Sequence, residues 1–203
     1  MFDLLAPDRE TDDDLAPVAR DAEPANFARH VMALTGSKVA DGLLDPKLVL
    51  SWLVTHLGAG SLWAGLLVPV REAGALLPQL FTSGVIHGMA RQKWAWAVGS
   101  LGQGGAAAGM VVAALTLSGW AAGATIVSLL ACLALSRSIC SVSYKDVLGK
   151  TVGKTRRGKV TGTAASMASG AVIVFALALM TGWPGRFELV IAALALAALG
   201  WFI

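Results

Sequence analysis

Long uncharged stretches divide the sequence into apolar segments long enough to span a membrane. No charged residue lies between Lys93 and Arg137, a run of 43 positions that Ser118 and Gly119 interrupt. A helix needs about 20 apolar residues to cross a hydrocarbon core of about 30 Å, so this run holds two spans and a tight turn. Two further apolar runs follow it, at 160–185 and, with the single acid Glu188, at 187–203. The pattern predicts an all-α integral membrane protein.

Residues 27–90 can be divided in two ways. A single span over 46–68 would leave Arg71 and Glu72 in a loop, whereas two spans would turn at 56–60. The turn residues Gly58, Gly60 and Ser61 favour two spans. We therefore expect a six-helix bundle over 27–203, with helices at 29–57, 60–84, 94–117, 119–142, 158–181 and 186–203.

The composition agrees with a lipid-embedded chain. Hydrophobic side chains make up 56% of the residues and charged ones 14%, and the mean hydropathy is +0.67. An average soluble domain is roughly 45–50% apolar and about 25% charged. Residues 1–25 carry eight acids against two arginines. We expect residues 1–26 to form an acidic, disordered cytoplasmic tail.

The charges in the expected connections predict the orientation. The connections 57–60, 118–119 and 182–186 contain one basic residue, Arg186, whereas 85–93 and 143–159 contain eight. Because Lys and Arg mark the cytoplasmic side, both termini should be cytoplasmic in a multi-pass protein of the cell (inner) membrane. The cytoplasmic loop residues that we single out are Arg91, Lys93, Arg156 and Arg157. Short basic loops between apolar runs indicate a lipid bilayer as partner and no nucleic acid.

Ionisable side chains within the expected spans are the most informative feature. An isolated charge at the bilayer centre costs at least about 2.5–3.5 kcal/mol, so such groups must pair or face water. Lys38, Asp41 and Asp45 follow one another at one-turn spacing on the first helix. Two interpretations remain open, a substrate or ion pathway between helices and an ion-pair network that only fixes packing. The candidate pathway residues are Asp41, Asp45, Arg71, Glu72 and Arg137. Arg137, near the cytoplasmic end of the fourth span, could equally extend to the interface.

No pattern of residues predicts an enzyme, a cofactor or a metal site. Residues 149–155 resemble a phosphate-binding loop, but Leu148 stands five positions before Gly153 where that loop needs glycine. The three histidines fall near different helix ends, and no nucleophile has a plausible partner. Glycines recur at four-residue spacing, most regularly along 158–170, which predicts close helix packing there.

The first expected helix contains Ala-Asp-Gly-Leu-Leu at residues 40–44 and Leu-Ser-Trp-Leu-Val at residues 50–54. This series resembles the Gly-Asp-Gly…Pro-Trp-Leu opening of many members of the major facilitator superfamily (MFS) of transporters, and the chain resembles the N-terminal half of such a protein. Residues 65–71 and 84–93 resemble the second span and the loop after it. Arg137 resembles the arginine of the fourth span, and 156–162 resembles the opening of the fifth. The likeness covers about 27–203.

The resemblance implies half of an MFS-type fold in a secondary transporter that moves a small solute by alternating access. The family has two six-helix halves, so the implied partners are a missing second half or a second copy, the solute, and protons as candidate coupling ion. The loop motif differs from the family's, with Gly88 at its aspartate position. The alternative is a non-catalytic six-helix membrane protein acting by association, or an inactive transporter fragment.

Overall fold

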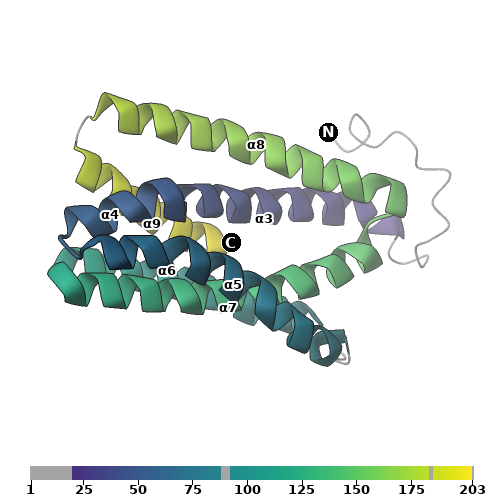
Figure 1. Cartoon of the computed structure of the whole chain (residues 1–203). Coiled ribbons are helices and arrows are strands. Elements are labelled where there is room, and N and C mark those ends of the chain that lie inside the picture. Colours follow the sequence, from purple (N-terminus) through teal and green to yellow (C-terminus); the bar gives the residue numbers. More distant parts are fainter. Residues whose placement is uncertain (1–19, 88–91, 183–184, 203) are drawn as a thin grey trace.

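The computed structural model describes residues 20–87, 92–182 and 185–202, with side chains outside 77–93 (Figure 1). These residues form helices and no strand, which confirms the all-α prediction. The elements are α3 (Glu23–Leu43), the π-helix η2 (Pro46–Leu50), α4 (Ser51–His56), α5 (Ser61–His87), α6 (Gln92–Thr116), α7 (Gly119–Thr151), α8 (Lys154–Thr181) and α9 (Arg186–Phe202).

The turn at 57–60 is confirmed. Gly58 and Gly60 have φ angles of 72° and 90°, a left-handed conformation that glycine adopts without steric cost. The chain thus reverses between α4 and α5, as the second partition predicts. The N–H of Gly119 donates to the carbonyl of Leu57 at 2.7 Å, which joins this turn to the α6–α7 turn at one end of the molecule.

Both helices around the basic segment 143–159 are longer than predicted. α7 continues to Thr151 and α8 begins at Lys154, so most of the predicted loop is helical. α3 begins at Glu23, inside the segment that we assigned to the acidic tail. The reason is a second small core, formed by Phe27, Val31, Leu148, Val152 and Val160, which buries an apolar face of all three helix ends. Charged positions on the other faces do not end a helix whose apolar face is buried. The rest of the predicted tail, residues 1–19, lies outside the described residues.

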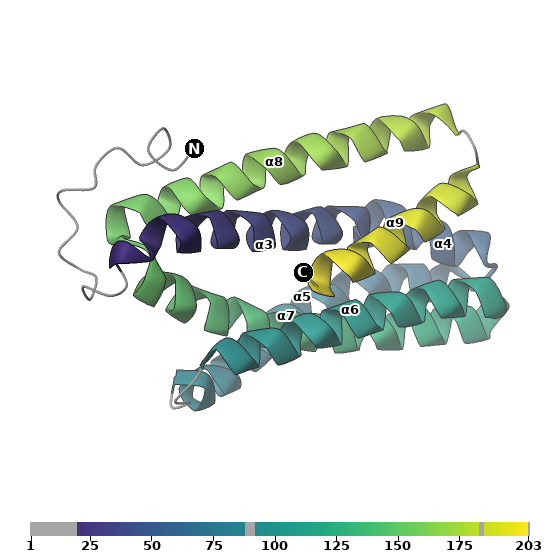
Figure 2. The ribbon, with the colours of Figure 1, turned by 180° about the vertical axis from the view of Figure 1, so that it is seen from behind.

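The helices run up and down between two ends of the molecule. Figures 1 and 2 show the α4–α5, α6–α7 and α8–α9 connections at one end, and the start of α3 with the α7–α8 junction at the other. α8 packs along α3, α5 and α6 pack on α7, and α9 contacts both α3 and α6. The main core lies between these helices and includes Leu50, Leu67, Ile126, Leu130 and Leu194, all without exposed surface.

Close helix contacts occur at glycines other than the regularly spaced ones along residues 158–170. A Cβ atom on Gly99 would lie 2.8 Å from the backbone oxygen of Ser136, and Gly36 faces the backbone oxygen of Gly200 in α9. Gly158, Gly162 and Gly170 meet nothing within 4 Å. The 158–170 ridge therefore packs on no described part of the chain, because α8 turns it away from α3.

Among the described residues, three helical segments are long and apolar enough to cross a membrane, namely Trp94–Thr116 of α6, α7 and α8. Only 11% of the most apolar window of α8 is buried within the chain. Exposed apolar side chains on its surface include Met167, Val174, Leu177 and Met180, each more than half exposed. Apolar surface of this extent indicates contact with lipid or with another protein. The chain is therefore a helical protein with the character of a membrane protein.

Candidate functional site

One carboxylate and two guanidinium groups from three helices meet in the interior. Nη2 of Arg71 in α5 donates to Oδ1 of Asp41 in α3 at 2.6 Å. Nη1 of Arg137 in α7 forms an ion pair with Oδ2 of the same carboxylate. We call Asp41, Arg71 and Arg137 the charge cluster. Charged hydrogen bonds of this type are roughly twice as strong as neutral ones, so the charge cluster ties α3, α5 and α7 together.

The charge cluster lies well inside the helices. Arg71 is ten residues from Ser61, about 15 Å along α5, which is half of a hydrocarbon core. Arg137 lies near the middle of α7, whereas the shorter fourth span predicted from the sequence placed it near a helix end. The Arg71 side chain is 10% exposed, that of Asp41 18% and that of Arg137 37%. Exposure therefore increases from α5 towards α7.

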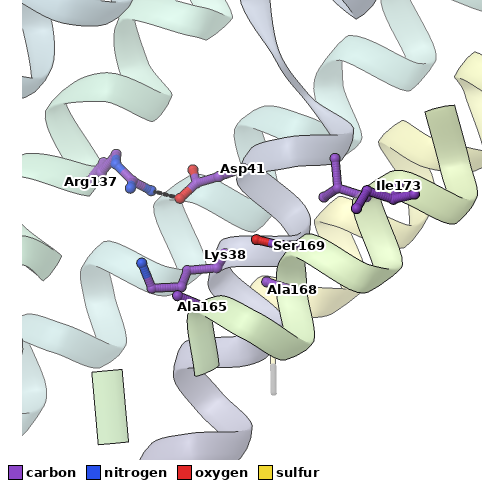
Figure 3. Close-up of a pocket in the computed structure, with 8 residues that line it drawn as sticks. Lys38, Asp41, Arg137, Ala165, Ala168, Ser169 and Ile173 are labelled. Atoms are coloured by element: carbon purple, nitrogen blue, oxygen red, sulfur yellow. Dashed lines mark ion pairs between the residues drawn. The ribbon is translucent and has the colours of Figure 1, made fainter. Parts of the chain in front are cut away.

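An open pocket of about 500 Å³ borders the charge cluster between α3, α7 and α8 (Figure 3). Lys38, Asp41 and Arg137 form its polar side. The residues contributed by α8 are Ala165, Ala168, Ser169, Val172 and Ile173. The volume lies within the range of small-molecule sites, about 300–1,000 Å³. α3 touches α7 little, and this leaves room for the pocket between them.

Lys38 adds a third positive charge to this region. It lies three residues before Asp41 on α3, so both side chains lie on the same side of the helix. Figure 3 shows its amino group on the same side of the pocket as Arg137. Within the described residues Lys38 has no hydrogen bond or ion pair. Among the described residues, Asp41 is the one acid that lines the pocket beside it.

Two of the five predicted pathway residues, Asp45 and Glu72, form no ion pair with the charge cluster within the described part of the chain. Oδ1 of Asp45 accepts the N–H groups of Lys47 and Leu48, each at 2.9 Å, and so caps η2. The signal for this role is present in the sequence, because an aspartate directly before a proline is typical of a helix start. Glu72 follows Arg71 but its side chain is exposed. The structure thus brings together Asp41, Arg71 and Arg137.

The predicted cytoplasmic loop residues have different environments. Arg91 lies outside the described residues, and Lys93 lies in α6 with its side chain outside them. Arg156 and Arg157 are in the first turn of α8 rather than in a loop, a correction that follows from the longer helices. The guanidinium of Arg157 donates to the carbonyls of Val152 and Gly149 at 2.9 and 2.8 Å and closes the end of α7.

Arg156 and Glu23 form a fully buried ion pair that the sequence did not reveal. Nε of Arg156 lies 3.0 Å from Oε1 of Glu23, and the two side chains are 1% and 0% exposed. The same carboxylate oxygen accepts the N–H of Gly153 at 2.9 Å. The pair fastens the start of α3 to the α7–α8 junction. We missed it because Glu23 was counted among the acids of the tail.

Histidine and cysteine side chains serve packing at the two ends. His30 Nε2 lies 2.8 Å from the Thr151 hydroxyl and its ring stacks on Trp96 at 5.9 Å, whereas His56 stacks on Trp52 at 4.8 Å. Cys140 Sγ donates to the carbonyl of Trp96 at 3.4 Å. Within the described part of the chain no three His, Cys, Asp or Glu side chains gather closely enough to hold a metal ion.

The chain matches no known protein-family model, no curated protein and no solved structure. Its functional interpretation therefore depends on the geometry of the site and on the sequence resemblance.

Proposed function

We propose that the chain is a six-helix membrane bundle and one half of a secondary transporter similar to MFS members. The α3–α4 unit, α5, α6, α7, α8 and α9 each cross the inner membrane, with both chain ends on the cytoplasmic side. The other half is a second six-helix unit, which in the purified protein is a second copy of the chain. A small solute binds at the charge cluster and crosses when the two halves rock about it.

The single observation that carries this proposal is the charge cluster beside a solute-sized pocket, among apolar helices. Ionisable groups at membrane depth are costly and mark solute or ion pathways. An ion pair that only fixes the packing of two helices needs one cation for one acid. Here Asp41 meets two arginines, and Lys38 stands at the same pocket. A binding site requires such additional polar groups at an open pocket, whereas an ion pair that only fixes packing does not.

The charge distribution supports the orientation. Lys145, Lys150, Lys154 and Lys159 lie around the α7–α8 junction, at the same end as the start of α3. Among the described residues the opposite end carries Arg186 and Lys47 as basic groups. The excess of basic residues marks the cytoplasmic side.

One observation favours a second candidate, association without transport. α8 exposes a nearly complete apolar face and a ridge of small residues, Gly158, Gly162 and Gly170, that meets no described part of the chain. Small residues let membrane helices approach closely. In that case the charge cluster only fixes helix packing, and the apolar face of α8 is the functional surface.

Solute counterflow separates the two candidates. The purified full chain is reconstituted into liposomes preloaded with one member of a panel, a short carboxylate, phosphate, an amine or a sugar, and uptake of the same labelled compound is followed. We expect saturable uptake of one class by the wild type, and its loss in Asp41→Asn. Asp21→Asn, an identical change at an exposed residue, keeps the uptake.

Absence of counterflow for the whole panel, from a chain that is inserted and folded, would contradict transport and favour association. Proton flux into pyranine-loaded vesicles, measured for the wild type and for Asp41→Asn and Glu72→Gln, tests the coupling ion separately. Unchanged flux in both variants would remove protons as the coupling ion.

A further inference from the structure

We propose that the pocket between α3, α7 and α8 binds a small organic anion, with Lys38 and Arg137 as the groups that hold its charged end. This inference rests on the proposed function and names the class of the transported solute. It follows from the charge balance, the free donors and the apolar wall of the pocket.

The charge balance of the pocket is positive. Lys38, Arg71 and Arg137 stand against Asp41, and the balance stays positive when the exposed Glu72 is counted with them. Both oxygens of Asp41 are already bound by arginines. The carboxylate is therefore compensated within the charge cluster, and a net positive charge remains at the pocket. Such a charge attracts an anion.

The donors that would meet the anion are free and accessible. A guanidinium has five N–H donors, and in Arg137 Nη1 is paired with Asp41. The Arg137 side chain is 37% exposed, so its other donors are accessible. Lys38 has three donors and no hydrogen bond within the described residues. Figure 3 shows the hydroxyl of Ser169 directed to the side on which Lys38 and Asp41 lie. Charged donors on α3 and α7 thus face a hydroxyl on α8 across the pocket.

The side of the pocket formed by α8 determines the chemical character of the uncharged part of the ligand. Apart from Ser169 it consists of Ala165, Ala168, Val172 and Ile173, which offer no hydrogen bonds from their side chains. A ligand with one charged end and a short hydrocarbon part would satisfy both sides of the pocket. A short-chain carboxylate has this form, whereas free phosphate presents negative charge without the apolar part.

The same chemistry has a second source, because an anionic lipid headgroup can enter a pocket that opens between helices. The test therefore uses nanodiscs of phosphatidylcholine alone and nanodiscs containing phosphatidylglycerol. In the first there is no anionic lipid, so anion binding there reports a free solute.

The experiment measures the binding of labelled butyrate, phosphate and choline to the full chain by scintillation proximity. We expect butyrate to bind in phosphatidylcholine nanodiscs, phosphate more weakly and choline not at all. Lys38→Gln and Arg137→Gln each remove a charged hydrogen bond and should weaken butyrate binding by about tenfold or more. Lys47→Gln, the same type of change at an exposed residue outside the pocket, should leave it unchanged.

Three binding outcomes would overturn the inference. Choline binding without anion binding would assign the pocket to cations, and anion binding that neither variant weakens would place the anion elsewhere. Retention of phosphatidylglycerol that depends on Lys38, with no binding of free anions, would make the ligand a lipid. Anion binding without counterflow would contradict the proposed transport and leave the anion site standing. Counterflow of a sugar alone would support transport and contradict the anion site.

Discussion

The Glu23–Arg156 ion pair and the charge cluster have different physical characters. Glu23 and Arg156 are withdrawn from solvent almost completely, and the carboxylate also accepts the N–H of Gly153. Breaking such a pair leaves an uncompensated charge, which typically costs about 3–5 kcal/mol. Asp41 instead lies where exposure increases towards a pocket. We therefore assign a structural role to the first pair and a binding role to the charge cluster.

Asp45 provides a test at the residue scale, because its geometry is that of a cap. Asp45→Ala removes the acceptor for the N–H groups of Lys47 and Leu48. We expect a loss of about 1 kcal/mol in the free energy of unfolding, as for other N-caps. Denaturant titration in detergent micelles measures the loss.

The same variant should keep its solute counterflow, unlike Asp41→Asn. If Asp45→Ala abolished counterflow while keeping its stability, Asp45 would belong to the pathway and its assignment as a cap alone would be wrong.

At the element scale, the contact between α6 and α7 depends on the missing side chain of Gly99. A Cβ atom there would lie 2.6 Å from Sγ of Cys140 and 2.8 Å from the backbone oxygen of Ser136. A backbone atom cannot rotate away, so Gly99→Ala must push the two helices apart. Overpacking of this type typically costs about 1–3 kcal/mol.

The matched control lies on the same helix. Gly105 meets nothing within 4 Å, and Ala is the better helix former by about 1 kcal/mol in water. We expect Gly99→Ala to lower the midpoint of thermal unfolding and Gly105→Ala to keep or raise it. Equal effects of the two substitutions would show that α6 and α7 are not packed as described.

The helix pattern could be predicted from the sequence to a useful extent. Uncharged runs and the glycines at 58 and 60 are local signals, and they place the turns and most helix starts correctly. The extension of α7 to Thr151 could not be predicted, because it depends on Leu148 and Val152 packing against Phe27 at the far end of the sequence. The partners of Glu23 and Asp41 are long-range for the same reason.

At the scale of the whole molecule, the helices form two groups that α9 joins. α8 and α3 form one, α5, α6 and α7 the other, and α9 contacts both (Figure 2). The pocket lies where α3 and α8 stand apart from α7. This arrangement places polar groups at an opening between the groups and apolar groups on the outside of α8. In a bilayer the first surface meets water and the second meets lipid.

The most direct test of this account compares two positions on α8 that are both exposed in the isolated chain. Ser169 lines the pocket, whereas Val174, which is 68% exposed, lies on another side of the helix, five residues further on. Each is changed to cysteine in a Cys132→Ala background, because Cys132 is the exposed native thiol and Cys140 is buried.

The chain is reconstituted in liposomes and treated with a membrane-impermeant maleimide, which reacts with thiolate in water. We predict rapid labelling of Ser169→Cys and none of Val174→Cys. Rapid labelling of both would show that α8 lies outside the membrane, and an unreactive Ser169→Cys would show that the charge cluster borders no water-filled crevice.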